Sequence, residues 1–536
     1  MAQLEAQARP ELRVLVCEKI AEAGVDYLRE RFTVDLGLDW SGEELRQRIG
    51  DYDALVVRSA TKVTADLLAR APRLQVVGRA GTGVDNVDVD AATRRGVMVC
   101  NAAGSNAVSA AEHAVALMLA QARNIPQAHS SLVAGRWERS RFAGVEVTGK
   151  TLGVLGFGRI GQLVAERAKG LGMHVIAYDP FVADRRFRDL GVDQAETPED
   201  LYAVSDFVSL HLASSAETRG FVDAAAFAAM KTGARLINAA RGDVVDQDAL
   251  VEALRSGKLG GAGIDVFPEE PATESPLFGL PGVVVTPHLG ASTEEAQDRA
   301  GVVVAEQVAA ALLGGMVTLA VNLPAVAPEA LEVLGPFVPL AGQLGQLLSE
   351  LAGGHVSTLE ITYEGQLAAL DTRLLTSAAL AGLLRGHVED PVNLVNAASL
   401  AADRGIEWTE TTSPRVRDYA NRLGLRAGPV SIAGTTIGTS SRPRLVSAFD
   451  QDLEIELAPH IGIFRYRDVP GQIGRIGTIL GRARVNIASM AVSRSRVEGG
   501  AVMAMTVDSP VPREVVAEIA ALEGFDAAWF VALIAE

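Results

Sequence analysis

Residues 151–161 read TLGVLGFGRIG, and this stretch decides the fold. An apolar run typical of a strand leads directly into a G-x-G-x-x-G motif made by Gly156, Gly158 and Gly161. A helical pattern follows, and Asp179 ends the next apolar run. In this order, the first glycine allows a tight turn, the second lets the backbone approach a diphosphate, and the third allows close helix–strand packing. The stretch therefore predicts a dinucleotide site on a Rossmann sheet.

The choice of dinucleotide is indicated by the residues around the motif. Arg159 and Ile160 open the helix, where unpaired N–H groups and a partial positive charge favour a diphosphate. Asp179 is expected to accept hydrogen bonds from ribose hydroxyls, and its charge would repel a 2′-phosphate. The sequence thus favours NAD over NADP, although Arg185 and Arg186 lie close by. A glycine-rich turn without a ligand is the alternative.

Strand and helix patterns alternate over the first 300 residues. The first series of apolar runs lies at 12–17, 54–58, 74–80 and 97–100, and the second at 151–158, 174–179, 207–211, 234–240, 261–265 and 283–288. Between them, Ser109 and Glu112 have capping-box spacing, which predicts a helix beginning at Ser109. A helical pattern after Ser292 is expected to return to the first series. This alternation predicts an α/β protein with parallel sheets.

The length of 536 residues fits three or four domains. We expect a discontinuous, flavodoxin-like substrate-binding domain (11–105 and 293–325) and a Rossmann NAD-binding domain (106–292). An α+β intervening domain (326–458) follows a Pro-rich joint. Residues 460–536 have the order strand, helix, strand, strand, helix, strand, which predicts a small ferredoxin-like unit.

Composition excludes several classes of protein. With 49 Lys plus Arg against 66 Asp plus Glu, the net charge is −17, and the basic footprint of a nucleic-acid binder is missing. Residues 307–328 are uncharged but contain Gly and Pro, so they predict a helix end, a turn and a strand rather than a membrane span. Cys17 and Cys100 are expected as buried thiols at strand ends. Two distant cysteines form neither a disulfide framework nor a metal site, which favours a reducing, cytoplasmic location.

Three segments follow strands of the second series and carry candidate catalytic residues. NAARGDVVD (238–246), GIDVFPEEP (263–271) and TPHLGAST (286–293) contribute Arg241, Glu270 and His288. Imidazole titrates near neutral pH and suits a general base, a carboxylate can orient it, and a guanidinium can grip a substrate carboxylate. Each residue alone is more often structural: a surface ion pair, a turn acid or a core histidine. All three in these contexts favour catalysis at the carboxyl edge of the sheet.

The succession of Arg241, D-V-F-x-x-E-P and P-H-x-G resembles the D-isomer-specific 2-hydroxyacid dehydrogenases over roughly residues 11–325. The resemblance implies an enzyme that transfers hydride between a secondary alcohol and NAD. Asp265 is expected either at the nicotinamide end of the cofactor or as a strand cap. Together with the motif residues, the implied cofactor contacts are Ala239, Ala240, Asp265, Gly290 and Ala291.

The substrate side resembles members of that family that oxidise 3-phospho-D-glycerate to 3-phosphooxypyruvate, the first step of L-serine biosynthesis. Arg58 and Arg79 can neutralise a phosphate, and the glycine-rich turn at Gly81 can bind a carboxylate. Ordinary surface arginines are the alternative. The implied substrate contacts are Arg58, Ser59, Arg79, Gly81 and Asn106. The segment with Trp137 and Arg139 is expected to meet a neighbouring subunit, within a homotetramer.

The last unit resembles an ACT domain, the small regulatory module of amino-acid metabolism. The matching residues include Tyr466, Asp468, Gly471 and Asn486, which the resemblance makes the binding site for L-serine as a feedback inhibitor. Asn486 is expected to come from a paired subunit. An ACT domain used for assembly alone is the alternative. Two further readings of the whole chain are a glyoxylate or hydroxypyruvate reductase and a nucleotide-sensing co-repressor.

Overall fold

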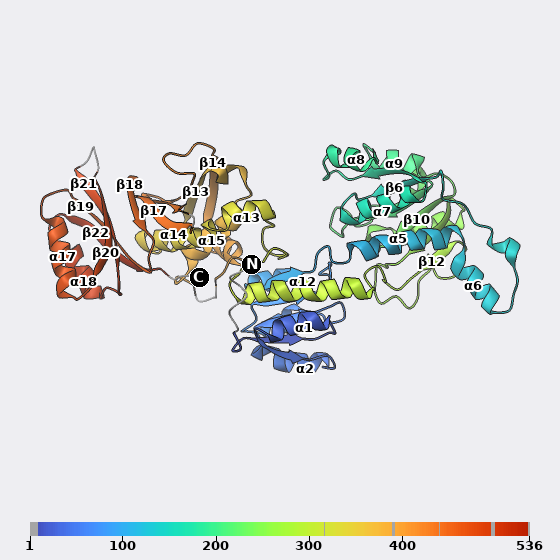
Figure 1. Ribbon diagram of the computed structural model, residues 1–536, viewed down its shortest axis with the longest axis horizontal. Coiled ribbons are helices and arrows are strands. Elements are labelled where there is room, and N and C mark those ends of the chain that lie inside the picture. Colours follow the sequence, from blue (N-terminus) through green and yellow to red (C-terminus); the bar gives the residue numbers. More distant parts are fainter. Residues whose placement is uncertain (1–8, 316, 389–391, 439, 495–498, 534–536) are drawn as a thin grey trace.

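The computed structural model describes residues 9–315, 317–388, 392–438, 440–494 and 499–533. Four β-sheets, each with its own helices, are spread along an elongated molecule (Figure 1). The first sheet lies at the bottom centre, the second at the upper right, and the two sheets of the C-terminal half at the left. The long helix α12 (Glu294–Leu312) runs between the first and second sheets.

The first sheet has the strand order β2-β1-β3-β4-β5, with every pair parallel, which is the flavodoxin-like arrangement. Its elements are β1 (Arg13–Val16), α1 (Glu22–Arg29), β2 (Thr33–Leu36), α2 (Gly42–Arg48), β3 (Ala54–Val57), α3 (Ala65–Ala69), β4 (Val76–Arg79), α4 (Val89–Arg94) and β5 (Met98–Asn101). The sequence did not predict β2, an edge strand with no buried residue. Helix α12 packs on α1 so closely that a Cβ on Gly24 would lie 2.5 Å from the carbonyl oxygen of Gly301.

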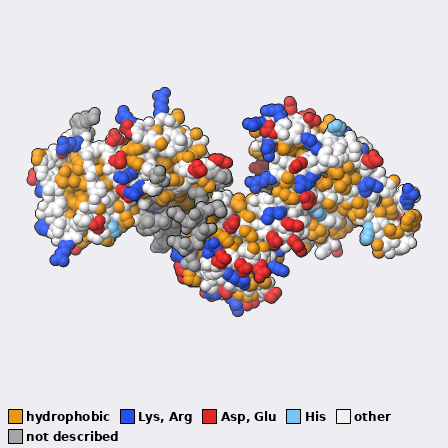
Figure 2. Space-filling view, viewed as in Figure 1, with side chains coloured by type: hydrophobic (Ala, Val, Ile, Leu, Met, Phe, Trp, Pro, Cys, Tyr) orange, Lys and Arg blue, Asp and Glu red, His pale blue; other side chains and the backbone are white. Residues whose placement is uncertain are grey.

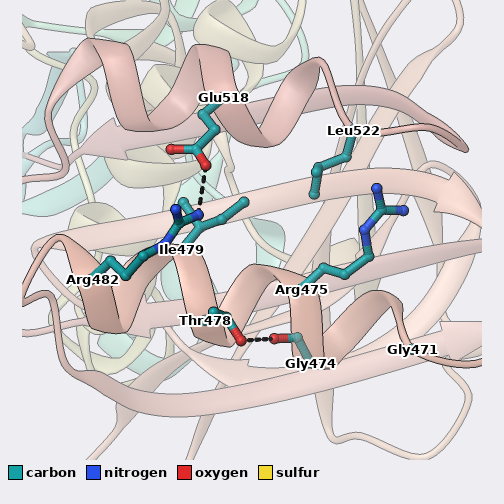
Figure 3. A pocket seen from close by; sticks show the side chains of 8 residues that line it. All are labelled: Gly471, Gly474, Arg475, Thr478, Ile479, Arg482, Glu518 and Leu522. Atoms are coloured by element: carbon teal, nitrogen blue, oxygen red, sulfur yellow. Dashed lines mark hydrogen bonds and ion pairs between the residues drawn. The ribbon is translucent and has the colours of Figure 1, made fainter.

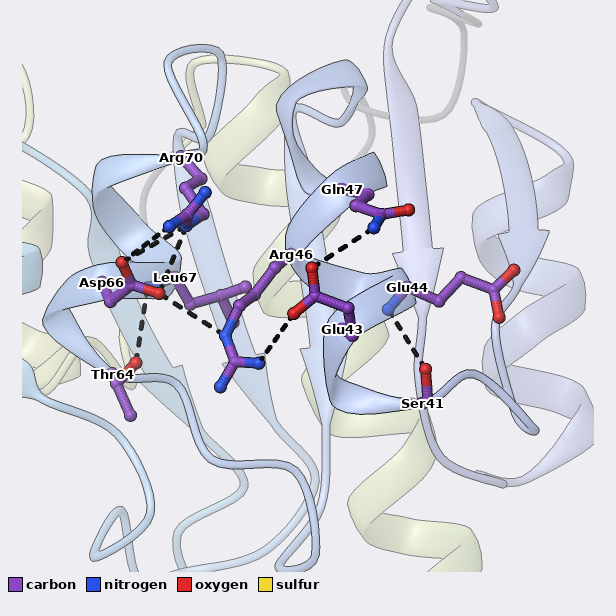
Figure 4. Close-up of polar contacts among 9 residues, drawn as sticks. All are labelled: Ser41, Glu43, Glu44, Arg46, Gln47, Thr64, Asp66, Leu67 and Arg70. Carbon is purple, nitrogen blue, oxygen red and sulfur yellow. Dashed lines mark hydrogen bonds and ion pairs between the residues drawn. The ribbon is translucent and has the colours of Figure 1, made fainter.

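Short polar side chains begin the exposed helices of this domain (Figure 4). Ser41 Oγ accepts the N–H of Glu44 at 3.2 Å, and Thr64 Oγ1 accepts that of Leu67 at 3.3 Å. Side-chain oxygens at these positions satisfy N–H groups that have no partner within the helix. Arg46 then bridges α2 to Asp66 on α3, 3.5 Å away. Because both side chains are exposed, this ion pair adds little to stability.

The second sheet has seven parallel strands in the order β12-β11-β10-β9-β6-β7-β8. The strands are β6 (Thr151–Leu155), β7 (His174–Tyr178), β8 (Asp193–Gln194), β9 (Phe207–Leu210), β10 (Ala234–Asn238), β11 (Leu259–Ile264) and β12 (Val283–Val285). The helices are α5 (Ala107–Ala122), α6 (Ile125–Val133), α7 (Arg159–Gly170), α8 (Asp184–Leu190), α9 (Pro198–Val204), α10 (Ala224–Ala229) and α11 (Gln247–Arg255). The chain reverses its direction across the sheet between β6 and β9, which is where ligands bind in such sheets.

The capping-box prediction at Ser109 is wrong. Helix α5 begins at Ala107, so Ser109 lies inside its first turn, and its Oγ lies 2.8 Å from Thr293 Oγ1 at the start of α12. The spacing was correct, but the hydroxyl joins two helices instead of capping one.

The C-terminal half contains two mixed α/β units. The first has the sheet β14-β13-β15-β16-β17-β18 and the second has β20-β21-β19-β22. The first comprises α13 (Pro328–Leu334), α14 (Phe337–Leu351), β13 (Thr358–Gly365), α15 (Arg373–Leu384), α16 (Ala397–Asp403), β14 (Glu407–Ser413), β15 (Asn421–Ala427), β16 (Val430–Ile437), β17 (Arg442–Ala448) and β18 (Gln451–Glu456). The second comprises β19 (His460–Arg467), α17 (Gln472–Arg482), β20 (Ile487–Arg494), β21 (Gly500–Val507), α18 (Arg513–Ala520) and β22 (Phe525–Ala532), in the predicted order.

These two units share one hydrophobic core. Buried side chains of the last sheet, among them Ile461 and Ile463, belong to the same cluster as Leu340 of α14. The ring of Trp529 stacks on Phe449 with centroids 5.6 Å apart. The C-terminal half therefore packs as one body, with the free face of the last sheet turned toward its neighbour (Figure 1).

The C-terminal half contacts the first domain through a small polar joint. The side-chain amide of Asn393 donates to the carbonyl of Gly96, in the turn between α4 and β5, at 2.7 Å. Close to this joint, Asn322 in the segment after α12 accepts the N–H of Val99 at 2.8 Å, which ties the chain leading into the C-terminal half to β5. Within the described ranges, no helix combines the length and apolar character needed to cross a membrane.

Candidate active site

Three loops meet at the carboxyl edge of the second sheet. In the parallel register, Asn238, Ile264 and Val285 lie side by side at the ends of β10, β11 and β12. Arg241, Glu270 and His288 follow these strand ends. Gly242 packs so tightly that a Cβ there would lie 2.0 Å from the carbonyl carbon of Phe267, which holds the Arg241 loop against the Glu270 loop.

His288 and Glu270 form a direct pair. The His288 Nδ1 lies 2.6 Å from Glu270 Oε2, and Glu270 Oε1 accepts the N–H of Phe267 at 3.0 Å. An ionised carboxylate can only accept, so Nδ1 carries the hydrogen and Nε2 keeps its lone pair. The His288 side chain is 49% exposed, so this lone pair can meet a substrate. The pair has the geometry of an oriented general base.

The turn that carries His288 is held by Asp265. His288 adopts a φ of +54°, a left-handed conformation that is costly for a residue with a side chain. Its N–H donates to the carbonyl of Asp265 at 2.8 Å. The Asp265 carboxylate accepts the N–H groups of Leu289 at 2.7 Å and Gly290 at 2.9 Å. These three hydrogen bonds to Asp265 stabilise the strained turn.

Asp265 therefore caps this loop. Its side chain is fully buried, and both oxygens accept hydrogen bonds from the protein. Burial raises the pKa of Asp265, but hydrogen bonds from His113, Thr286 and the Leu289 N–H outweigh burial and leave the pKa below its usual range. The carboxylate is thus a fixed anion, and of the two predicted roles the structure favours the cap.

Arg241 reaches from the second sheet toward the first. Its Nε lies 3.8 Å from Asp85 Oδ2, and its Nη2 would lie 2.6 Å from a Cβ on Gly83. Its Nη1 donates to the carbonyl of Ala240 at 2.8 Å. The guanidinium thus lies between the two domains, where it can meet a carboxylate held by both.

Arg79 ends β4 and faces the same region. Its Nε is buried without a hydrogen-bond partner in the described part of the chain. Burial lowers the pKa of Arg79, Asp85 opposes that shift, and the nearby cations of Arg241 and Arg58 add to it. A half-buried cation with a buried, unsatisfied Nε–H and cationic neighbours is poised to bind an anion.

The other predicted substrate residues surround this cation. A Cβ on Gly81 would lie 2.0 Å from Arg79 Nη1, so a side chain there would displace the guanidinium from this position. Asn106 Oδ1 accepts the hydroxyl of Thr82 at 2.8 Å, and Arg58 donates to the carbonyl of Lys19 at 3.3 Å. Ser59 is exposed in the loop after β3. The structure therefore places all five at the carboxyl edge of the first sheet.

The glycine motif forms an open cradle at the start of α7. Gly156 has a φ of +94°, and a Cβ on Gly161 would lie 2.1 Å from the carbonyl oxygen of Gly156. At Gly158 a Cβ would meet nothing within 4 Å. The first and third glycines are thus required by the fold, while the second leaves its space for a ligand. This division fits a dinucleotide diphosphate.

The remaining cofactor predictions lie around the cradle. Asp179 Oδ2 accepts the N–H of Phe157 at 2.8 Å, which sets its carboxylate beside the glycine turn. Ile160 is half-buried in the first turn of α7, and Arg159 extends toward Gly104 at the entry to α5. Ala239 and Ala240 follow β10, and Gly290 and Ala291 follow the His288 turn.

The predicted effector residues are divided between the two ends of the last sheet. Asp468 and Gly471 lie in the loop before α17, where Asp468 Oδ2 is 3.2 Å from Arg494 Nε. Asn486 precedes β20, at the end where Ile487 pairs with Val507, and its amide donates to Asp508 at 2.6 Å. At about 3.3 Å per residue, the length of β20 separates the two ends by roughly 20 Å.

The side chain of Tyr466, another predicted effector residue, lies in the core of the last unit. It is 2% exposed, and its ring stacks on Phe525 with centroids 5.2 Å apart. Alternation along β19 turns Tyr466, like Phe464, toward the helices. Gly471, by contrast, is exposed at one end of a groove between α17 and α18, which Arg482 and Glu518 bridge at 2.7 Å (Figure 3).

Sequence reasoning missed three polar residues of the site: Asp85, His113 and Thr286. Asp85 lies in the glycine-rich segment already singled out, and its exposed acid beside Arg79 was a usable signal. His113 lies within a helical apolar pattern and meets Asp265 only in three dimensions. Among the described residues, no group of three or more His, Cys, Asp or Glu side chains is arranged to hold a metal ion.

Changing Gly158 to Ala tests the cradle. Because the added methyl group meets nothing in the protein, the variant should keep the melting temperature of the parent. Its affinity for NADH should fall by about tenfold or more, because the methyl group takes the space of the diphosphate. Fluorescence titration with NADH measures this. Gly170→Ala, at an equally open glycine of α7, is the control; equal NADH affinity in both variants would contradict the cradle.

Comparison with known protein families divides the chain into recognised parts. Residues 115–290 match the NAD-binding domain of the D-isomer-specific 2-hydroxyacid dehydrogenases. Residues 333–449 match the D-3-phosphoglycerate dehydrogenase intervening domain, and residues 461–524 match the ACT domain.

Among solved structures, the holo form of D-mandelate dehydrogenase from Rhodotorula graminis aligns with a TM-score of 0.55 at 29% identity, covering 60% of this chain and 100% of that one. A glyoxylate reductase from Paecilomyes thermophila aligns with a TM-score of 0.54 at 29% identity, over 58% and 99%.

Curated relatives extend the match over nearly the whole chain. The D-3-phosphoglycerate dehydrogenase of Mycobacterium leprae is 45% identical over 95% of this chain and 97% of its own length. That of Synechocystis is 42% identical over 97% of this chain and 95% of its own. The chain therefore belongs to the D-3-phosphoglycerate dehydrogenase family, a branch of the D-isomer-specific 2-hydroxyacid dehydrogenases.

Proposed function

We propose that the chain catalyses the NAD-dependent oxidation of 3-phospho-D-glycerate to 3-phosphooxypyruvate, the first step of L-serine biosynthesis. The observation that carries this is the convergence of the oriented His288–Glu270 pair with the half-buried Arg79 cation near Arg241. The first supports dehydrogenation of an alcohol, and the second supports a substrate with more than one anionic group. Relatives of this architecture are named for the same substrate.

In this mechanism Arg241 and the glycine-rich turn at Gly81 bind the substrate carboxylate, while Arg79 and Arg58 bind the phosphate. His288 Nε2 takes the proton of the substrate hydroxyl, and the charge that develops on the ring is stabilised by Glu270 at Nδ1. Bound NAD, held by Gly158 and Asp179, supplies the acceptor for the hydride that leaves the substrate carbon. The products are the keto acid, NADH and a proton on His288.

We also propose that the chain functions as a homo-oligomer, and specifically as a homotetramer. The segment from α6 to residue 142 extends from the second domain and exposes Leu132 (55%), Val133 (74%) and Trp137 (81%). Figure 2 shows this arm at the right, with hydrophobic side chains at its surface. Exposed apolar side chains on an extended segment support contact with a second copy of the chain.

The division into a two-segment substrate domain (11–105, 293–325), a Rossmann domain (106–292), an intervening domain (326–458) and an ACT domain (460–536) remains our proposal, as does a cytoplasmic location. Burial raises the pKa of Cys17 and of Cys100 to about 12, so both thiols are unreactive. Two inert thiols fit a reducing compartment.

The substrate assignment is tested by comparing kcat/KM for 3-phosphoglycerate with that for unphosphorylated glycerate. The ratio should exceed about 10², because charge-assisted hydrogen bonds contribute roughly 1.5–3 kcal/mol each. Arg79→Leu should lose most of that preference. Faster turnover of glyoxylate or hydroxypyruvate than of the phosphorylated acid would instead assign the chain to the reductases on this scaffold.

The catalytic base is tested by changing His288 to Asn. Turnover should fall by roughly 10²–10⁴, because no other group takes the hydroxyl proton, while NADH affinity stays close to that of the parent. Steady-state kinetics and NADH titration measure the two effects. The same substitution at His174, exposed at the start of β7, is the matched control. Unchanged turnover in the His288 variant would remove this residue from the mechanism.

L-serine is proposed as the feedback inhibitor, bound between Asp468 and Gly471 of one subunit and Asn486 of another. The separation of these residues within one chain supports a shared site. Asn486→Ala should raise the concentration of serine for half-inhibition by about tenfold or more, because the amide is a donor and an acceptor to the ligand. Glu514→Ala, in the first turn of α18, is the control. Unaltered inhibition in the Asn486 variant would place the site elsewhere.

A further inference from the structure

His113 links the helix that enters the second domain to the turn that carries the proposed base. It lies on α5, and its Nε2 is 3.1 Å from both Asp265 Oδ1 and Thr286 Oγ1. The Thr286 hydroxyl donates to Asp265 Oδ1 at 2.6 Å. The hydroxyl hydrogen of Thr286 points to the carboxylate, so neither Asp265 nor Thr286 has a hydrogen to donate to His113. The His113 Nε2 must therefore carry a hydrogen itself. The imidazole is therefore a donor to this pair.

The carboxylate that His113 contacts determines the shape of the 286–290 turn. Asp265 accepts the N–H groups of Leu289 and Gly290, and its carbonyl accepts that of His288. The positive φ of His288 depends on these bonds. Because the carboxylate is fully buried, no water can replace a lost donor without opening the loop.

We propose that His113 is a positioning residue for catalysis. Its Nε2–H fixes the Asp265 carboxylate, and that carboxylate fixes the turn that aims His288 at the substrate hydroxyl. The inference rests on the proposed function, in which His288 is the base. It also connects α5, the first helix after the first domain, to the site, so that the entry to the Rossmann domain and the base move together.

Two variants at position 113 distinguish a role of His113 as a hydrogen-bond donor from a role in packing alone. A leucine at position 113 fills much of the imidazole volume but has no donor. A glutamine places its amide nitrogen near the position of Nε2. If the donor matters, glutamine substitutes for histidine and leucine does not; if packing matters, the two variants behave alike.

The experiment uses the full-length protein, with 3-phosphoglycerate and NAD as substrates and NADH as the binding probe. His113→Leu should lower kcat by about tenfold or more. The NADH dissociation constant should change much less, because the diphosphate cradle at Gly158 lies on another loop and only Gly290 and Ala291 of the cofactor contacts lie at the 286–290 turn. His113→Gln should restore kcat to within about threefold of the parent. Melting temperatures confirm that each variant is folded.

A parent-like kcat in folded His113→Leu overturns the proposal, and so does a His113→Gln variant as slow as the leucine variant. Should the leucine variant not fold, His113→Asn replaces it. Its amide is one methylene too short for Nε2, so it should be slow where His113→Gln is fast. His288→Asn separates the two claims. If that variant keeps its activity, the proposed function fails; if it is inactive while His113→Leu is unimpaired, only the role of His113 fails.

Discussion

The parallel pairing of β10, β11 and β12 is the constraint on which the site depends. Parallel strands in register end at one edge, so three segments far apart in sequence deliver their first loop residues to one place. None of the three loops could position an arginine, a carboxylate and an imidazole alone. The buried Asp265 carboxylate then refines this coarse alignment, because it connects the end of β11 to the turn after β12.

Local patterns were sufficient to predict most of the architecture and the principal residues of the site. The glycine motif can be recognised from sequence because its geometry depends on a few neighbouring residues. The structure confirms that Gly156 makes the turn and that Gly161 allows close packing. Short or exposed elements were missed: β2 buries no residue, and β8 has two residues. Neither gives the apolar periodicity by which a strand is predicted from sequence.

Residues whose partners lie far away in sequence were harder to place. Ser109 has the spacing of a cap, yet its hydroxyl meets Thr293 on another helix. For Asp265 the sequence left a cofactor contact and a cap open, and only the fold shows that its buried carboxylate accepts N–H groups of the His288 turn. His113 gave no signal at all, because an apolar helix conceals the one face that meets Asp265.

The hydrophobic core that the last two domains share also limits which conformational changes can connect the ACT domain to the active site. A small-molecule effector bound at the ACT domain would act on a sheet whose inner face is buried against α14 and its neighbours, so that sheet cannot move independently of them. The C-terminal half would move as one body about its polar contact between Asn393 and Gly96. Removing the ACT domain would therefore expose a large hydrophobic surface on the intervening domain, and the truncated chain would be expected to lose solubility.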